Sequence, residues 1–516
     1  MRISLKRHCL IVNCPVVLLL WIFTHSAFAQ NPPSSSGSDS GIAQCLPTEN
    51  LMEAAVKNYG KCGRQWSRAE QHVIDMIAAG QAADLKNGTL EERTISGCLV
   101  SYLLSDNSVV SAAGVDIRDA IIVGPVDLRN QEIKHGADFI HCDFRDVVNL
   151  KRSHSTRRLF FKDCTFLARV DAESAIVDFD LVFDSCSFND CLTFLKSLHI
   201  GGDLWLNNTK FRGEADFTET EVKGDFMATQ TEFHQGEAGQ TVKLGIPAAD
   251  FDSMKVAGAT ELNDAQLYGY VGFGDGHFGN LFLNGSRFFG NTSLTRTKLD
   301  GLFLENANFL AANNPSQLLT IDEMTFQDMN PASWDKLKDF ARAANYKPEF
   351  YSSLEALFLR HGYPDQATEV YIAGQRRERE DLWSKAGTEK RLATKARLGA
   401  AWFGNLALDK LLGYGRHKER ILGVSGVILL LGWFFAFRKE DWMKPMDPGD
   451  SDRLKGKYRG FWYSLDLFLP VIDFGDADNW TPKEERRWSA RYRRVHMILG
   501  YVLVPIGLAA FAGIIK

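Results

Sequence analysis

The sequence predicts a mainly β solenoid flanked by helices, and three observations support this fold class. A hydrophobic residue returns every 11 residues, as at Ile117, Leu128 and Phe139. An α-helix needs a period of 3.6 residues and a hairpin sheet a period of 2, so this fixed long step indicates stacked coils. Helical spacing before the repeat predicts an N-terminal cap. Helical spacing and two apolar segments after it predict a helical hairpin and two C-terminal transmembrane helices.

The repeat has two phases, and two steps make one coil of about 22 residues. Strands of neighbouring coils lie about 4.8 Å apart, so residues 99–311 would form roughly eight to nine coils and a rod of about 40 Å. We expect the members of both phases to point into the core: Ile117, Leu128, Phe139, Leu150, Phe161, Phe183 and Phe194 in one, and Ile122, Ile133, Phe144, Phe166, Val177 and Phe188 in the other.

The N-terminus has the pattern of an exported protein. Basic residues, an apolar run and Ser26-Ala27-Phe28-Ala29 predict a signal peptide over 1–29, cleaved after Ala29. An uncleaved anchor is the alternative, and both would export the solenoid. Residues 30–44 are rich in Pro, Ser and Gly and predict a disordered linker. Residues 45–98 predict the helical cap, with one helix from Arg68 to Ala79.

Seven cysteines remain after the signal peptide. Cys45 and Cys62 flank one short predicted helix and could form a disulfide, although the pairing of Cys45, Cys62 and Cys98 stays open. Three others recur once per coil and would stack as small inward residues; a chance disulfide or a metal site are the alternatives. They are Cys142, Cys164 and Cys186.

Composition argues against several classes of function. Fifty-nine basic residues against 64 acidic ones give a net charge of −5, without the basic excess that nucleic acid requires. The chain has no metal-ligand histidine spacing and no Gly-x-Gly-x-x-Gly opening a βαβ unit. One column of acidic and amide residues falls on alternate sides of the coils, which argues against a catalytic pair: Asp116, Asp127, Asp138 and Asn149. We therefore expect no catalytic, cofactor or metal site.

The C-terminal third is predicted to be helical and membrane-associated. Residues 321–412 form a helical region, broken at Gly362-Tyr363-Pro364 into a hairpin. Residues 421–437 and 495–515 are apolar enough to span a bilayer, and a buried pair of soluble helices is the alternative. Lys and Arg are more numerous on the inner side of both segments, so the loop 438–494 should be cytoplasmic. Within it, 461–475 is too apolar for a plain loop and predicts an interfacial or re-entrant segment.

Two sets of motifs resemble a known family. Four triplets pair a small residue with Asp or Asn and a large apolar residue: Ala137-Asp138-Phe139, Ala215-Asp216-Phe217, Ala249-Asp250-Phe251 and Ala307-Asn308-Phe309. They resemble pentapeptide-repeat proteins, whose fold is a right-handed quadrilateral β-helix, although this chain has an extra residue in alternate steps. We expect the Asp/Asn position to lie in a turn. Leu412-Gly413-Tyr414-Gly415, Ser464-Leu465-Asp466 and Leu469 to Gly475 resemble the tail of bacterial pentapeptide-repeat membrane proteins.

These inferences together predict a non-enzymatic protein in the cytoplasmic (inner) membrane of a bacterium. Its β-helix would lie on the periplasmic side as a scaffold or binding surface for an unknown protein or envelope polymer. Membrane lipid is an expected partner, nucleic acid is not, and an oligomer is compatible with the sequence. An envelope carbohydrate-active enzyme is a further alternative.

A channel-like function is the second hypothesis. The segment from Tyr463 to Asp476 resembles the pore helix and filter of two-helix potassium channels, with Asp473-Phe474-Gly475-Asp476 in place of Gly-Tyr-Gly-Asp. It departs from that pattern because Asp473 replaces the first glycine, and because the predicted loop faces the cytoplasm. The candidate functional residues of the membrane region are Asp466, Pro470, Asp473, Phe474, Gly475 and Asp476.

Overall fold

The structure, a computed structural model, describes residues 66–105, 108–190, 192–234, 247–309, 319–417, 419–447, 449, 451–469, 472 and 474–512. The chain divides into two units, Met1–Thr48 and Glu49–Lys516, and all described residues belong to the second. The predicted signal peptide, the linker, Cys45 and Cys62 lie outside the described residues.

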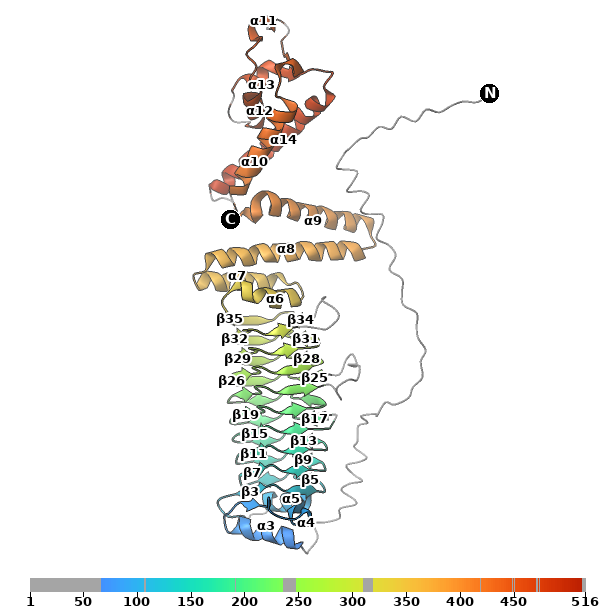
Figure 1. Ribbon diagram of the computed structural model, residues 1–516, viewed down its shortest axis with the longest axis vertical. Helices are drawn as coiled ribbons and strands as arrows, with labels where there is room; N and C mark the ends of the chain where they lie inside the picture. The colour runs from blue at the N-terminus through green and yellow to red at the C-terminus, as the bar shows by residue number, and fades with distance from the viewer. Residues whose placement is uncertain are drawn as a thin grey trace, which may run out of the picture. The chain divides into compact units, whose positions relative to one another are not determined.

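The second unit contains a parallel β-solenoid of about eight turns (Figure 1). Each coil from Val115 to Val222 has four short strands, and in the later coils one longer strand, first Lys255–Glu261, takes the place of two. Strand pairing matches Asp143 with Thr165 and Thr165 with Ser187, and each pair is separated by one full coil of the predicted repeat. Four ladders of parallel strands run through the coils.

The first ladder comprises β1 (Ala83–Asp84), β3 (Val115–Arg118), β7 (Ala137–Ile140), β11 (Leu159–Lys162), β15 (Leu181–Asp184), β19 (Leu204–Trp205), β23 (Phe226–Met227) and β26 (Lys255–Glu261). The second comprises β2 (Thr94–Ser96), β4 (Ile121–Val123), β8 (Asp143–Phe144), β12 (Thr165–Phe166), β16 (Ser187–Phe188), β20 (Lys210–Phe211), β24 (Glu232–His234), β27 (Gln266–Tyr268), β30 (Arg287–Phe288) and β33 (Asn308–Phe309).

The third comprises β5 (Val126–Asp127), β9 (Val148–Asn149), β13 (Val170–Asp171), β17 (Leu192–Phe194), β21 (Glu214–Asp216), β25 (Pro247–Asp250), β28 (Tyr270–Gly272), β31 (Thr292–Ser293) and β34 (Leu319–Thr320). The fourth comprises β6 (Glu132–Ile133), β10 (His154–Ser155), β14 (Ile176–Val177), β18 (His199–Ile200) and β22 (Glu221–Val222). The fourth ladder joins the first at β26, because β26 pairs with both β22 and β23. Three longer strands continue the merged ladder: β29 (His277–Phe282), β32 (Lys298–Phe303) and β35 (Thr325–Asn330).

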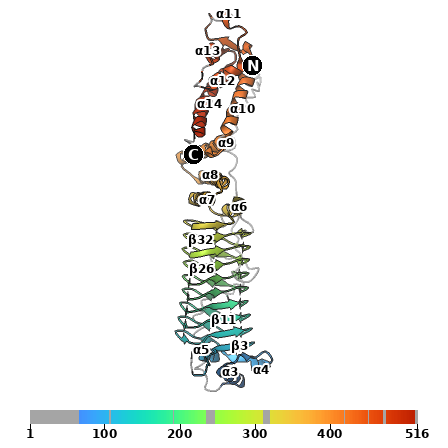
Figure 2. The same cartoon turned by 90° about the vertical axis from the view of Figure 1, so that its left-hand side faces the viewer.

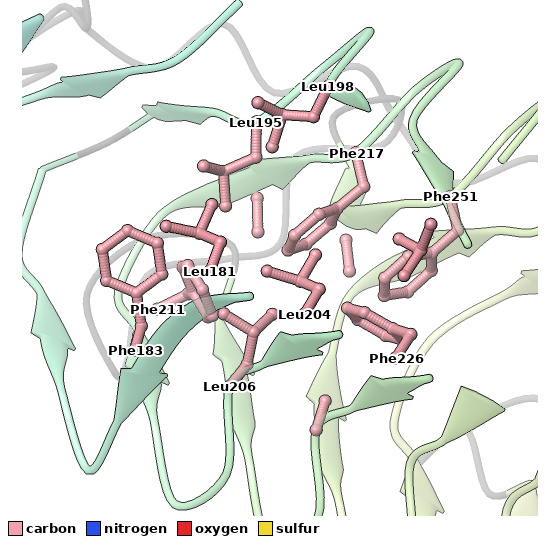
Figure 3. Close-up of a cluster of buried hydrophobic side chains, with 14 of the residues drawn as sticks. Leu181, Phe183, Leu195, Leu198, Leu204, Leu206, Phe211, Phe217, Phe226 and Phe251 are labelled. Atoms are coloured by element: carbon pink, nitrogen blue, oxygen red, sulfur yellow. The ribbon is translucent and has the colours of Figure 1, made fainter. Parts of the chain in front are cut away.

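The solenoid interior consists of stacked apolar side chains, as the hydrophobic repeat predicts. In one column the ring centroids of Phe144, Phe166 and Phe188 are 4.8 Å apart, and Phe211 follows at 4.7 Å. Leucine and phenylalanine side chains of successive coils point into this shared interior (Figure 3). Because each ring packs on its counterpart one coil away, coil-to-coil register and core packing reinforce each other.

Phe194 is an exception to the predicted phase. Thr193 and Leu195 are buried, whereas Phe194 is partly exposed, with Arg169 and Lys196 over its ring at 5.2 and 5.5 Å. Here Ser187 pairs with Lys210, so this coil is one residue longer than its neighbours. Since alternate residues of a strand face opposite sides, one extra residue moves Phe194 outward.

Turns occur at the same interval as the hydrophobic repeat, but not at the Asp/Asn position of the triplets. Asp216 and Asp250 end strands, and each accepts a hydrogen bond from the backbone N–H two residues later, at 3.0 Å. The turn residue follows, with a left-handed φ of 60° at Glu219 and 59° at Ser253. The predicted bonding to nearby backbone is correct, while the predicted placement in the turn is wrong because the aspartates still belong to the strands.

The cysteine column belongs to the core. Cys142, Cys164 and Cys186 are buried and free, and each thiol donates to a carbonyl of the preceding coil, as Cys142 does to Ile117 at 3.5 Å. The same position in the next coil holds Thr209, whose hydroxyl donates to the Phe183 carbonyl at 2.6 Å. The slot therefore accepts a small side chain with a hydrogen-bond donor.

A helical cap covers the first coil. It comprises α3 (Arg68–Ala78), α4 (Leu90–Arg93) and α5 (Gly97–Ser105). Ser67 and Glu70 form a capping box that starts α3, and a carboxylate oxygen of Glu70 also accepts the backbone N–H of Ser96 at 3.0 Å. Cys98, on α5, is disulfide-bonded, and its partner lies outside the described residues. The expected boundary at residue 99 falls inside α5, and β1 and β2 already pair with the first coil.

The solenoid extends beyond the expected end at residue 311, to Asn330 in β35. Helices α6 (Trp334–Ala343), α7 (Pro348–Arg360), α8 (Pro364–Thr388) and α9 (Leu392–Leu412) follow. Phe340 of α6 packs against Phe309 with ring centroids 5.4 Å apart, so α6 covers the last coil. The break between α7 and α8 at residues 361–363 confirms the predicted helical hairpin.

The C-terminal part contains helices that lie side by side (Figures 1 and 2). Its elements are η2 (Gly413–Gly415), α10 (Glu419–Leu431), the π-helical η3 (Gly432–Ala436), η4 (Glu440–Trp442), β36 (Met443–Pro445), α11 (Ser451–Leu454), α12 (Gly460–Phe468), α13 (Asp476–Asn479), β37 (Trp480–Pro482) and α14 (Arg487–Phe511). Strands β36 and β37 pair antiparallel.

Among the described residues, one helix is long and apolar enough to cross a membrane. It runs from Glu419 to Ala436, with 18 residues and a mean hydropathy of 1.6, and 17% of it is buried. The expectation of two transmembrane helices is thus supported for one segment. The predicted second span, 495–515, is part of α14, which already begins at Arg487 with several arginines, while residues 513–516 lie outside the described part of the chain.

Candidate functional site

The predicted membrane motif runs from α12 to the start of α13. Four of its six residues are described: Asp466, Phe474, Gly475 and Asp476. Pro470 and Asp473 lie outside the described residues. The structure brings Phe474, Gly475 and Asp476 to one side of a cavity and places Asp466 behind them, on α12.

The side chain of Asp466 forms hydrogen bonds with the backbone of the segment that follows α12. The side chain is largely buried, and its two carboxylate oxygens accept hydrogen bonds from the backbone N–H groups of Phe474 at 2.9 Å and Ala477 at 2.7 Å. A carboxylate satisfied by two backbone donors stabilises a folded-back connection. The carboxylate of Asp466 therefore has a structural role within this segment.

Asp476 forms the charged part of the site. Its carboxylate lies 2.9 Å from the Arg459 guanidinium and is 9% exposed. Burial raises the pKa of Asp476, and the positive charge of Arg459 opposes that rise. The Arg459 guanidinium also lies 5.6 Å from the centre of the Trp462 ring. The guanidinium of Arg459 therefore stabilises the charged form of Asp476.

A cavity of about 520 Å³ adjoins this ion pair. Tyr458 forms one wall, packed edge-on against Trp480 with centroids 5.2 Å apart and donating its hydroxyl to the Phe437 carbonyl at 2.7 Å. The described lining contains cationic, anionic, aromatic and amide groups. It comprises Leu454, Gly456, Lys457, Tyr458, Arg459, Phe474, Gly475, Asp476, Asn479 and Trp480.

A buried serine–histidine contact joins α12 and α14, and no sequence motif indicates it. His496 Nε2 lies 2.9 Å from the Ser464 carbonyl oxygen and 3.2 Å from Ser464 Oγ, and both residues are fully buried. Because a carbonyl only accepts, Nε2 must carry the proton, and the hydroxyl donates to the Leu429 carbonyl at 3.0 Å. His496 therefore ties helices together and does not activate Ser464 as a nucleophile.

This contact lies where three helices approach closely. A Cβ on Gly432, in the π-helical turn, would lie 2.7 Å from Ser464 Oγ and 2.8 Å from His496. The Tyr492 hydroxyl donates to the Ile428 carbonyl at 3.4 Å, close to the carbonyl that accepts from Ser464. Polar side chains thus satisfy backbone carbonyls next to an irregular turn, as apolar surroundings require.

A second polar cluster joins α8, α9 and the start of α10. Asp409 is 2% exposed and accepts from Arg376 at 3.2 Å and Arg379 at 2.9 Å. Burial opposes ionisation of Asp409, but the hydrogen bonds from both arginines lower its pKa overall. Tyr414 donates to Asn405 at 2.7 Å and accepts from Arg379 at 3.3 Å. The Gly413-Tyr414-Gly415 motif can be recognised in the sequence, but the sequence does not indicate the hydrogen bonds that Tyr414 makes.

Three consecutive left-handed residues form the corner after α9. Their φ angles are 52°, 54° and 81° for Gly413, Tyr414 and Gly415. Glycine adopts this conformation at little cost, whereas a tyrosine requires compensation. The hydrogen bonds of Tyr414 to Asn405 and Arg379 provide it, so this corner has a defined geometry.

The acidic column of the solenoid has the arrangement that the repeat predicts. Asp116 and Asp138 lie in the first ladder, whereas Asp127 and Asn149 lie in the third. The aspartates pair with basic neighbours, as Asp116 does with Arg118 at 2.8 Å and Asp127 with Arg129 at 2.7 Å. Successive members therefore belong to different faces, and each aspartate has a structural partner.

The fold and the described site define a class: a parallel β-solenoid with a helical C-terminal region that contains one candidate membrane span. Comparison of the chain with protein-family models, curated proteins and solved structures found no match.

Proposed function

We propose that this chain is a non-enzymatic, membrane-anchored envelope protein whose β-helix is a scaffold or binding surface for another protein or an envelope polymer. The packed interior supports this function, because its stacked rings occupy the space inside the coils. The outer faces then carry the interactions. A ladder repeats the same backbone position at every coil, so its outer side chains form regular columns.

A column of aromatic side chains on the outer face of the second ladder is the main observation that supports this function. The rings of His234 and Tyr268 stack at 4.4 Å, and those of Tyr268 and Phe289 at 4.5 Å. Phe289 directly follows β30 and is 38% exposed, and Leu167 directly follows β12 of the same ladder and is 49% exposed. Rigid aromatic side chains on an exposed face are typical of binding surfaces, since they offer apolar area at little entropic cost.

The helical C-terminal region supplies the anchor in this proposal. Large apolar side chains of α10 and η3 are exposed, as are Ile498 and Leu508 of α14, at 61% and 63%. A bilayer would cover them, with α10–η3 and α14 crossing as two spans and the loop 438–494 in the cytoplasm. The β-helix would then lie on the periplasmic side of a bacterial inner membrane. The disulfide at Cys98 supports an oxidising compartment.

The four-sided coil also supports a relation to pentapeptide-repeat proteins. The four strands of each coil from Val115 to Val222 agree with the quadrilateral β-helix of that family, as do buried triplet residues such as Ala137 and Phe139. The coils are slightly longer than those of the type fold and vary in length, as the pairings of His277 with Lys298 and Ser187 with Lys210 illustrate. We therefore propose an enlarged relative of that fold.

The channel hypothesis is tested by conductance. The full chain would be reconstituted in planar bilayers, alone and as Asp473→Ala. We expect no cation conductance from either protein. A conductance that disappears in the variant would replace the scaffold proposal with a channel or a channel subunit.

Site-specific photocrosslinking in native envelopes tests the scaffold. A photoreactive amino acid at Tyr268 or Phe289 should form one adduct of defined mass, whereas Lys162, on the outer face of the first ladder, should form none. Leu167→Ala and Tyr268→Ala should each lower the adduct yield at Phe289. Absence of an adduct at both aromatic positions, or an equal yield at Lys162, would overturn the assignment of this face.

A further inference from the structure

Helix α9 has an exposed face that no described part of the chain covers. It packs along α8: Trp402 lies 5.3 Å from Trp383 of α8, and the buried Asn405 donates to the Gln375 carbonyl at 3.2 Å. Away from α8, Phe403 is 60% exposed and Leu408 is 49% exposed. Residues with small side chains continue this exposed side: Ala393, Ala396, Ala400 and Gly404.

The exposed charges of α9 are all basic. Its one acidic residue, Asp409, is buried against Arg376 and Arg379. Lys395, Arg397 and Lys410 are exposed, and Lys390 and Arg391 precede the helix. The surface of α9 therefore combines apolar side chains with positive charge, which suits the interface between acyl chains and anionic phospholipid headgroups.

α9 is also continuous with the candidate membrane span. The left-handed corner at Gly413-Tyr414-Gly415 comes directly after α9, and Arg420, at the start of α10, donates to the Asp409 carbonyl at 3.4 Å. The span begins at Glu419. The C-terminal end of α9 thus lies where the chain enters the apolar segment, at the level expected for headgroups.

From these contacts we propose that α9 is an interfacial helix, which lies in the plane of the bilayer surface and binds anionic phospholipid with the face that contains Phe403 and Leu408. This inference rests on the membrane anchor proposed above. It adds a second contact with the membrane. The corner at Tyr414, held by hydrogen bonds, would then connect α9 on the membrane surface to α10 in the membrane. Two such contacts would restrict the tilt of α9 and of the α8 helix packed on it.

Depth-dependent fluorescence quenching tests the placement of α9. The full chain would be reconstituted in phosphatidylcholine vesicles with phosphatidylglycerol, with a fluorescent amino acid at Phe403, at Val427 in the span or at exposed Gln131 in the solenoid. Spin labels near the lipid headgroup should quench Phe403 severalfold more than Gln131, and labels deep in the acyl chains should quench Val427. Quenching at Phe403 no greater than at Gln131 would overturn the interfacial helix. Failure of lipid quenching at Val427 would instead overturn the membrane anchor.

A charge variant tests the lipid class. Lys395→Gln combined with Arg397→Gln should reduce quenching at Phe403 in phosphatidylglycerol vesicles to the level in phosphatidylcholine alone. Lys134→Gln, on the solenoid, is the matched control and should leave it unchanged. Circular dichroism would verify that helix content is retained. Equal quenching in both lipids, with or without the substitutions, would overturn the preference for anionic headgroups.

Discussion

A Cβ atom on Gly500 would lie only 2.1 Å from the carbonyl oxygen of Phe468, so α14 and α12 meet backbone to backbone at this point. Gly460 of α12 has a similar relation to the Phe437 carbonyl, at 2.3 Å. Such contacts require glycine, because a side chain would force the helices apart. The helical C-terminal region therefore depends on two close approaches of its backbone, at Gly460 and Gly500.

Gly500→Ala should destabilise this region by about 1–3 kcal/mol, because the methyl group has no space against a backbone atom. Thermal unfolding of the detergent-solubilised full chain, followed by tryptophan fluorescence, would measure the loss. Gly423→Ala is the matched control, since nothing lies within 4 Å of its Cβ position. Equal melting of both variants would contradict the inferred contact.

Asp409→Asn should lower stability by about 2 kcal/mol, since it removes the charged acceptor shared by Arg376 and Arg379. The Arg379 side chain is only 18% exposed, so water replaces the lost partner poorly. A urea titration of the full chain would show the change. Asp339→Asn affects a pair with Arg342 whose side chains are 88% and 76% exposed, and it should change little. A similar loss in both variants would refute a special role for Asp409.

Phe211→Ala should cost about 3–5 kcal/mol, because it removes a fully buried ring from the aromatic column and leaves a cavity. Its ring stacks at 4.7 Å on Phe188 and at 5.2 Å on Phe233. Chemical denaturation of the full chain would report the shift. Phe179→Ala, at a 51% exposed position, should shift the midpoint far less. A small effect at Phe211 would mean that neighbouring coils repack independently.

The solenoid should lose stability as pH rises through the window set by Glu214. Burial, with the negative charges of Asp216 and Asp250, raises the pKa of Glu214 from an ordinary 4.5 to about 7. Between these values the folded state holds more protons than the unfolded state, so the free energy of unfolding falls with increasing pH. Asp250 shows the same direction, with burial raising its pKa from 3.8 to about 6.

Glu214→Gln should flatten this pH dependence and raise the melting temperature at pH 8 by roughly 2 °C, since it removes a charge that burial disfavours. Melting curves between pH 5 and pH 8 would test this. Glu132→Gln, at an exposed side chain, serves as the control. A slope unchanged by Glu214→Gln would place the responsible groups elsewhere.

The solenoid was predictable because its signal is repetitive. Phe139 and Phe161 are separated by one coil of the repeat and stack at 5.3 Å, so the spacing alone indicates the contact. Phe194 was misassigned, because a single extra residue leaves the hydrophobic spacing nearly unchanged but reverses the side that faces the core. The end of the β region was predicted too early, because the hydrophobic spacing of the sequence stops at Phe309, whereas β34 and β35 follow from Leu319 on.

The candidate site was predictable only as a segment. Its amino acids identified 461–475 as unusual, and Asp466 and Asp476 as charged residues in apolar surroundings. The partners of these two residues could not be predicted. Asp466 accepts hydrogen bonds from backbone groups, and Asp476 pairs with Arg459, which directly precedes α12 and belongs to no recognisable motif. The contact of Ser464 with His496 joins residues far apart in the chain, and a single histidine in an apolar run has no distinctive pattern.

The sequence by itself determined the solenoid, its coil length, most of its inward columns and the presence of an apolar C-terminal segment. These properties follow from a periodic pattern, and burial of apolar side chains acts on every repeat in the same way. The tertiary structure decided which face carries Phe194, how Asp409 and Tyr414 form the corner before the span, and which side of α9 remains exposed. Those features depend on single contacts between distant residues, and hydrogen bonds and close backbone approaches leave no periodic trace in a sequence.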